Sequence, residues 1–194
     1  MRLKRPAIII SAILSLISGT LFLIERKSSV NANNLFSNTA YSTNSPYFSK
    51  RTSLVNGRYE WSYTSEDNVF SHYSLQYTGR YVYGDFNHDG LKDAAVILIE
   101  NSGGNADWYT LAFLINDGKK FVHQASGVLG DRAIVNSLRQ KNGSVLVDMF
   151  IYQDGDCMAG PTSHVKTVFE YGEGRRWIEG VRISAKSLDR KSVV

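Results

Sequence analysis

Cysteine is almost absent from this sequence: Cys157 is the only one in 194 residues. A single thiol excludes an internal disulfide, even in an oxidising compartment that would permit one. Its distance from the N-terminus also excludes a lipoprotein anchor. The stability of the fold therefore has to come from packing and from bound ions.

Net charge is also lacking once the N-terminal segment is set aside. The chain has 22 basic and 18 acidic residues, and residues 1–32 hold five of the basic and one of the acidic ones, which leaves 17 of each. A neutral chain has little of the counterion release that drives binding to nucleic acids. We therefore expect no nucleic-acid partner.

Residues 1–32 are typical of an export signal. Basic residues precede an apolar stretch of 18 residues, Ala7 to Ile24, and Val30-Asn31-Ala32 fits cleavage by a signal peptidase. The stretch also approaches the roughly 20 residues that span a bilayer, so an uncleaved anchor is the alternative. In both cases the excess of positive charge before the stretch directs the rest of the chain outward. We expect a periplasmic or extracellular protein that meets the membrane only through this segment, if it stays uncleaved.

Helical periodicity is scarce in the rest of the chain. Residues 33–53 include 12 Ser, Thr or Asn residues and predict a flexible spacer. In residues 54–178, short apolar runs alternate with turn residues, which predicts one β-rich domain. Residues 179–194 are basic and have no apolar stripe, so we expect a disordered tail.

The fold class predicted for residues 54–178 is mainly β, with little helix. We expect about eight antiparallel strands joined by hairpins, arranged as a single sheet, a sandwich or an open barrel. Tyr59, Trp61 and Tyr63 alternate with polar residues, which is the period of a strand. The continuously apolar residues 94–99 predict a strand covered on both faces, at the centre of a sheet. The one place for a short helix is 65–76.

Three hairpins are expected in the second half of this domain. The Asp-Gly pair within residues 116–120 supplies the positive φ of a tight turn. Asn142-Gly143 is the strongest hairpin signal of the chain. A last hairpin is expected between residues 165–171 and 175–178.

Oxygen-bearing side chains recur at alternate positions in Asp85-Phe86-Asn87-His88-Asp89-Gly90-Leu91-Lys92-Asp93. Calcium takes six to eight hard oxygen ligands, and alternate residues of a curled segment point at one centre. Gly90 allows the sharp turn. We predict a Ca²⁺ site with these ligands: Asp85, Asn87, Asp89, the Leu91 carbonyl, and Asp93 directly or through water.

The predicted site differs from an EF-hand. The twelfth position holds Val96 where an EF-hand has a bidentate Glu, and a strand is expected to follow in place of a helix. With three carboxylates and no bidentate Glu, we expect a dissociation constant of roughly 10⁻⁴–10⁻³ M. The alternative is an acidic turn that holds no ion. His88 lies between ligand positions and is expected to be exposed.

Residues 84–96, GDFNHDGLKDAAV, resemble the calcium loop and following strand of FG-GAP and VCBS repeats. Only one copy is present, whereas a propeller needs at least four blades. The chain also resembles a family of exported bacterial proteins of unknown function. That resemblance covers residues 54–178 and rests on these segments: GDFNHDGLKDAAVIL, NSGGNADWYTLAFLINDGK, GVLGDRAIVNSL, VDMF and GPTSHV.

This second resemblance implies a periplasmic or surface domain without known chemistry. The family tends to have a Pro-Cys-Cys-Pro-like segment where this chain reads Asp156-Cys157-Met158-Ala159-Gly160-Pro161. The departure leaves no basis for carrying over a thiol or disulfide role to Cys157.

Other clusters favour structural explanations. Cys157, His164, Asp154 and Asp156 include the residue types of a thiol nucleophile and its base, but a lone thiol in a loop explains them as well. Residues 101–105 lack the Lys of a phosphate loop and indicate a hairpin loop. Asp131-Arg132 indicates a local ion pair. Dense aromatics indicate strand packing, with a sugar- or peptide-binding face as the alternative; they are Tyr59, Trp61, Tyr63, Phe70, Tyr73, Tyr77, Tyr81 and Tyr83.

Three functions remain open on these grounds. The leading hypothesis is an exported, non-catalytic, calcium-stabilised module with a binding or structural role in the envelope and a glycan or protein partner. The second is a hydrolase-type envelope enzyme that uses the loop or Cys157 with His164, which requires a pocket joining them. The third is a carbohydrate-binding module that uses the aromatic face around Trp61.

Overall fold

The computed structural model describes residues 31–42, 51–64, 66, 70–153, 155–157, 160–172 and 178–184. The chain forms two compact units, residues 1–36 and 37–194. Of the first unit only residues 31–36 are described, as part of a helical segment over residues 31–37. The predicted leader therefore lies outside the described residues except for its last two. The second unit contains all the strands.

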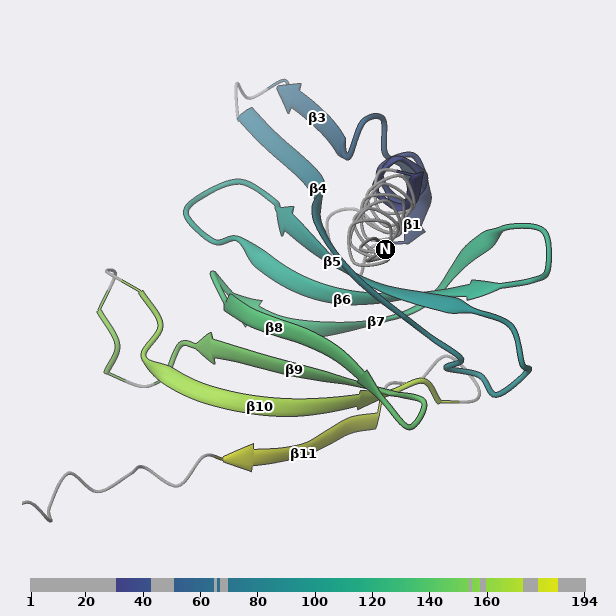
Figure 1. Cartoon of the computed structure of the whole chain (residues 1–194). Helices are drawn as coiled ribbons and strands as arrows, with labels where there is room; N and C mark the ends of the chain where they lie inside the picture. Colours follow the sequence, from purple (N-terminus) through teal and green to yellow (C-terminus); the bar gives the residue numbers. More distant parts are fainter. Residues whose placement is uncertain are drawn as a thin grey trace, which may run out of the picture. The chain divides into compact units, whose positions relative to one another are not determined.

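Five antiparallel strands form the larger sheet (Figure 1). Their order is β3-β4-β5-β6-β7, so each strand pairs with its neighbours in sequence. Strand β5 is central and buried from Asp93 to Leu98, which confirms the prediction for residues 94–99. The strands are β3 (Arg58–Thr64), β4 (Phe70–Gly84), β5 (Asp93–Asn101), β6 (Trp108–Asn116) and β7 (Phe121–Asp131).

Four further antiparallel strands form a second sheet, in the order β11-β10-β9-β8. Asn142 and Gly143 join β8 to β9 with φ angles of 51° and 77°, the left-handed pair that this hairpin turn requires. The turn between β10 and β11 lies outside the described residues, and β11 begins at Ile178, where the predicted second strand of this hairpin, 175–178, was expected to end. The strands are β8 (Ile134–Lys141), β9 (Ser144–Ile151), β10 (Ser163–Glu170) and β11 (Ile178–Ser184).

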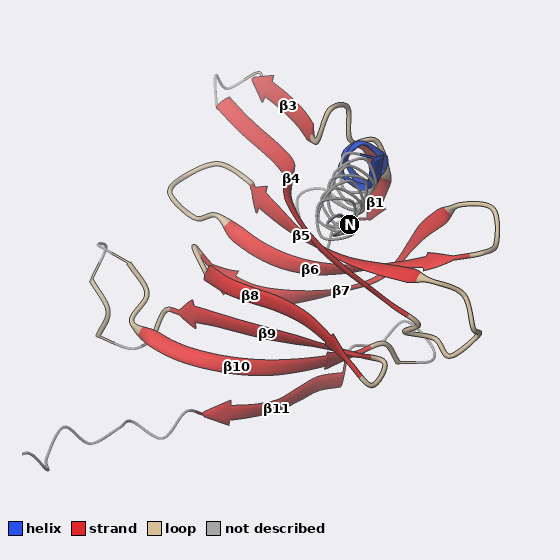
Figure 2. Ribbon diagram, viewed as in Figure 1, coloured by secondary structure: helices blue, strands red, loops and turns tan. Residues whose placement is uncertain are grey.

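The two sheets share one apolar core. Ile97 and Phe113 of the larger sheet pack in the same cluster as Val147 and Phe169 of the smaller one. Phe86 joins this cluster and meets Phe113 edge to face, with ring centroids 5.0 Å apart. The arrangement is a sandwich, one of the three architectures expected, and strands dominate it (Figure 2). The described residues hold eleven strands, more than the eight expected.

A third, two-stranded sheet lies within the segment predicted as a flexible spacer. Strand β1 (Ala40–Ser42) pairs with β2 (Arg51–Ser53). Tyr41 is fully buried and its ring contacts His123 of β7 at 5.7 Å. The prediction of a flexible spacer is therefore wrong for these described residues, because β1 is held by a buried aromatic ring that the polar composition concealed.

Two further expectations are corrected by the strands. The possible helix over residues 65–76 is absent from 70–76, where β4 alternates exposed and buried side chains. The predicted tail is partly strand, because β11 continues the smaller sheet to Ser184; residues 185–194 lie outside the described part. Within the described residues, no helix has the length and apolar character needed to cross a membrane.

Candidate metal centre

The predicted calcium loop connects two paired strands. Gly84 at the end of β4 pairs with Asp93 at the start of β5, so residues 85–92 close a loop at one end of this strand pair. The unit is strand, loop and strand, as the sequence predicted. His88 and Gly90 have positive φ angles of 61° and 83°. The turn at Gly90 was expected, whereas the left-handed conformation of His88 was not.

Three of the predicted ligand side chains turn toward the backbone of their own loop. The Asp85 carboxylate accepts hydrogen bonds from the N–H of Asp89 at 3.1 Å and of Gly90 at 3.0 Å. The Asn87 side-chain oxygen accepts from Asp89 N–H at 3.2 Å, and Asn87 Nδ2 donates to Asp89 at 2.7 Å. Asp89 in turn accepts from Leu91 N–H at 2.7 Å. The fold therefore brings Asp85, Asn87 and Asp89 together.

Asp93 has a different environment, because its side chain is fully buried. Its Oδ2 accepts hydrogen bonds from the backbone N–H of Phe86 at 2.8 Å and of Asn87 at 3.4 Å. Its Oδ1 accepts from the N–H of Asn116, at the end of β6, at 2.9 Å. A buried carboxylate is tolerated only when it is hydrogen-bonded. Through these hydrogen bonds Asp93 connects the start of the loop to the β6–β7 hairpin.

The oxygen-only donor set fits a hard cation such as calcium. Asp93 meets the first half of the loop through the backbone N–H groups of Phe86 and Asn87. Among the residues that the structure describes, no three Asp, Glu, His or Cys side chains are grouped as a metal ion would require. Convergence of Asp85, Asn87, Asp89, the Leu91 carbonyl and Asp93 on one ion stays a prediction.

The loop packs against two neighbouring elements. Gly84 lies so close to the Phe86 ring that an added Cβ would be 2.6 Å from Cε1. A Cβ on Gly143, in the β8–β9 turn, would lie 2.5 Å from Cε1 of His88. His88 is exposed, as predicted, yet its ring covers that turn. Lys92 Nζ lies 4.1 Å from the centre of the Tyr83 ring.

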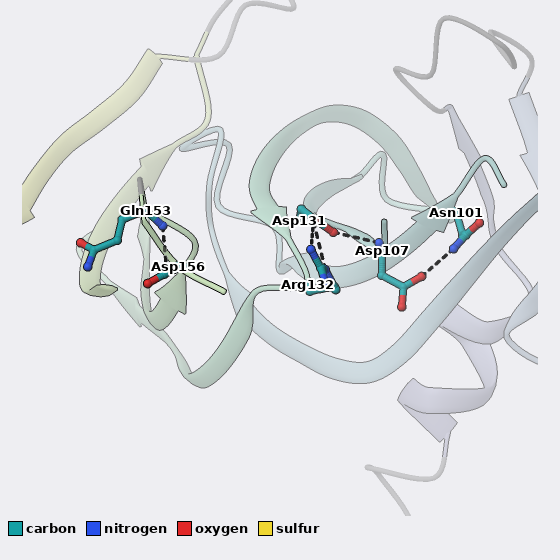
Figure 3. Close-up of polar contacts among 6 residues, drawn as sticks. All are labelled: Asn101, Asp107, Asp131, Arg132, Gln153 and Asp156. Atoms are coloured by element: carbon teal, nitrogen blue, oxygen red, sulfur yellow. Dashed lines mark hydrogen bonds and ion pairs between the residues drawn. The ribbon is translucent and has the colours of Figure 1, made fainter. Parts of the chain in front are cut away.

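The contacts of the described residues do not assemble the thiol cluster that the sequence analysis set aside in favour of a lone thiol in a loop. His164 pairs with Asp148 of β9 at 2.7 Å. Hydrogen bonds from Asn136 and then from His164 lower the pKa of Asp148 to about 2. Asp156 accepts from Thr162 and from Gln153 N–H at 3.0 Å, which closes its own loop (Figure 3). Cys157 is exposed and free, and Asp154 lies outside the described residues.

A polar network that sequence reasoning did not find joins the ends of three strands (Figure 3). Asp131 and Arg132 form the expected local ion pair, at 2.8 Å. Asp131 also accepts from the N–H of Asp107 at 3.0 Å, and the Asp107 side chain accepts from Asn101 Nδ2 at 2.9 Å. Arg132 covers the Tyr152 ring at 4.5 Å. The sequence signals were the Asn-Ser-Gly-Gly-Asn loop and the Asp131-Arg132 pair, and they did not reveal the bond between Asp107 and Asp131, which are 24 residues apart.

The predicted packing holds for only part of the aromatic set: Tyr59, Tyr81 and Tyr83 are partly buried, and Phe70 is 66% exposed. Tyr73 and Tyr77 of β4 are buried, whereas Trp61 and Tyr63 of β3 stay 39% and 51% exposed. The rings of Trp61 and Tyr63 are nearly parallel, at 11°, with centroids 5.9 Å apart. Parallel rings this close overlap in part and do not lie side by side as one flat platform.

Comparisons with protein-family models, with curated proteins and with solved structures found no match.

Proposed function

We propose that this chain is an exported, non-catalytic β domain that is stabilised by calcium and serves a binding or structural role in the cell envelope. The observation that carries the calcium part is the loop between β4 and β5. It gathers the oxygens of Asp85, Asn87 and Asp89 directly beside the paired ends of two strands. The resemblance to FG-GAP and VCBS loops and to exported bacterial proteins supports the same proposal.

Calcium would act on this loop through charge. The Asp85 carboxylate accepts from the N–H groups of Asp89 and Gly90, and the Asp89 carboxylate accepts from the N–H of Leu91, so both carboxylates lie in the same tight turn. Like charges this close repel one another, and a divalent cation reverses the sign of that interaction. At millimolar calcium and a dissociation constant near 10⁻⁴ M, binding to the folded state alone contributes about 1.4 kcal/mol.

A non-catalytic role is favoured over the enzyme alternative by the contacts of His164. Its partner is Asp148, on a neighbouring strand of the smaller sheet, and both side chains are partly exposed. Neither Cys157 nor His164 lines the hollow beside the loop, which includes Tyr83, Lys92 and Gln140. The contact described for His164 is a hydrogen bond to Asp148 at the surface, which does not require a thiol.

The test is thermal unfolding in EDTA and in millimolar calcium. A gain of about 1.4 kcal/mol raises the melting temperature by about 3–6 °C for a domain of this size. Asp89→Ala should abolish the shift, because it removes a ligand at an exposed position. Asp117→Ala is the matched control: Asp117 also accepts two backbone N–H groups in an exposed turn but is no predicted ligand. Equal melting temperatures of the wild-type protein in EDTA and in calcium would refute the calcium part.

A further inference from the structure

One face of the larger sheet extends beyond the part that the smaller sheet covers. Strand pairing places Gln76 opposite Ile99 and Ser74 opposite Asn101, on the same face as the core residue Ile97. This face of the larger sheet is therefore apolar where it packs against the smaller sheet and polar where it approaches β3. Figure 1 shows β3 and the first part of β4 away from β8–β11. This end of the face is open.

Two adjoining hollows lie on this open face, and we call them together the β4 groove. One has a volume of about 580 Å³ and the other of about 380 Å³, and both are lined by Gln76, Ile99 and Asp107. Each volume falls within the roughly 300–1,000 Å³ of small-molecule sites. Ala133 and Val135, at the start of β8, form one wall, and the loop with Gly103 and Gly104 forms another.

The β4 groove has no net charge from its arginines and carboxylates. Arg58 pairs with Glu60 at 2.5 Å, and Arg132 pairs with Asp131 at 2.8 Å. Arg80 and Asp107 line the groove together, and Arg80 donates a hydrogen bond to the Val135 carbonyl. Counted with Glu60 and Asp131, the three arginines are matched in number by three carboxylates, so an anionic ligand such as a phosphate group gains little from the groove.

The remaining groups of the β4 groove are hydrogen-bonding side chains and one aromatic pair. Ser74, Gln76 and Asn101 supply hydroxyl and amide groups along the floor. Phe70 and His72 form one end, with parallel rings at 10° and centroids 6.4 Å apart. Phe70 is 66% exposed, so its ring is open to contact with a ligand.

We propose that the β4 groove binds an uncharged oligosaccharide. The hydroxyl groups of such a ligand match the amide and hydroxyl groups of the floor, and the apolar face of a sugar ring packs on Phe70. A peptide that adds as a strand would bind at a sheet edge, whereas this groove lies on a sheet face. The proposal gives a ligand class to the binding role proposed above and rests on that role, but it does not depend on calcium.

The test is calorimetric titration of the protein with chitotetraose, cellotetraose and maltotetraose, and with tetragalacturonate as a charged counterpart. At least one neutral probe should bind. Phe70→Ala should weaken that binding about tenfold, and Gln76→Ala, which removes one amide partner, about two- to tenfold. The matched control is Tyr63→Ala: Tyr63 is 51% exposed on the opposite face of the same hairpin. This control should change the affinity less than about twofold.

Three results would overturn the proposal. They are no binding of any neutral probe, binding of tetragalacturonate as tight as that of the neutral probes, and a loss with Tyr63→Ala as large as with Phe70→Ala. If only Tyr63→Ala lost saccharide binding, the binding site would be the opposite face of the hairpin, which carries Trp61 and Tyr63. Each titration is repeated in EDTA and in calcium, so that saccharide binding without a calcium effect contradicts only the calcium proposal. A calcium effect without saccharide binding contradicts only the β4 groove.

Discussion

Replacing Asp93 with Ala is the most informative perturbation of the loop. The substitution removes a fully buried carboxylate that accepts three backbone N–H groups. The N–H groups of Phe86 and Asn116 donate to it at 2.8 and 2.9 Å. The N–H of Asn87 is 3.4 Å away, so its hydrogen bond contributes little to stability. The first two donors would be left in or near the interior without an acceptor.

The magnitude follows from those two bonds. A hydrogen bond to a charged group contributes about 1.5–3 kcal/mol, so losing two of them in Asp93→Ala should lower the free energy of unfolding by about 3–6 kcal/mol. That is a large part of the roughly 5–15 kcal/mol of a typical domain. Asp93→Asn should lower the free energy of unfolding by less than Asp93→Ala does. The amide oxygen still accepts one hydrogen bond, whereas the NH₂ group faces a backbone donor and cannot accept from it.

Urea denaturation in EDTA measures this effect, because the absence of metal isolates the hydrogen bonds. Asp117→Ala is the control, since Asp117 accepts from Lys119 and Lys120 N–H at an exposed turn where water can replace it. Its free energy of unfolding should change far less than that of Asp93→Ala. An Asp93→Ala protein that unfolds at the same urea concentration as the wild type would refute the structural role of this carboxylate.

Three further predictions concern other residues. Burial, more than any other cause, lowers the pKa of His123 to about 4, and its neutral Nδ1 accepts from Ser42 N–H at 2.9 Å. The unfolded state, with a His pKa of about 6.5, binds the proton at a higher pH than the folded state does. About 3 kcal/mol of stability should therefore be lost as the pH falls from 6.5 to 4. If the melting temperature of a His123→Phe protein fell as steeply with pH as that of the wild type, this explanation would be contradicted. Gly84→Ala should destabilise by about 1–3 kcal/mol in urea, because the new Cβ would meet the Phe86 ring at 2.6 Å. Cys157→Ser should change the free energy of unfolding by less than about 0.5 kcal/mol, since the thiol is exposed.

The sequence predicts much of the larger elements of this fold. Period-two alternation located β3, the apolar run 94–99 located β5, and Asn142-Gly143 located the β8–β9 turn, because each is a local signal of backbone conformation. What escaped prediction depends on partners distant in sequence. Strand β1 forms because Tyr41 is buried beside His123, and no local pattern in a Ser- and Asn-rich segment reveals that contact.

The candidate site shows the same division. The spacing of oxygen-bearing residues identified the loop, and the structure brings Asp85, Asn87 and Asp89 together in it. The burial of Asp93 and its bond to Asn116, 23 residues away, could not be foreseen from spacing. The β4 groove was not predicted from the sequence either. Its polar residues on β4 follow the ordinary alternation of a strand with one exposed face, and this pattern does not reveal a groove.

The most direct test of the central claim is a calorimetric titration of calcium into the metal-free, folded protein. A loop that gathers the oxygens of Asp85, Asn87 and Asp89 should bind one ion with a dissociation constant of roughly 10⁻⁴–10⁻³ M. Asp85→Asn combined with Asp89→Asn should eliminate the heat of binding, and Asp117→Asn should preserve it. The absence of any saturable heat with the wild-type protein would contradict the account.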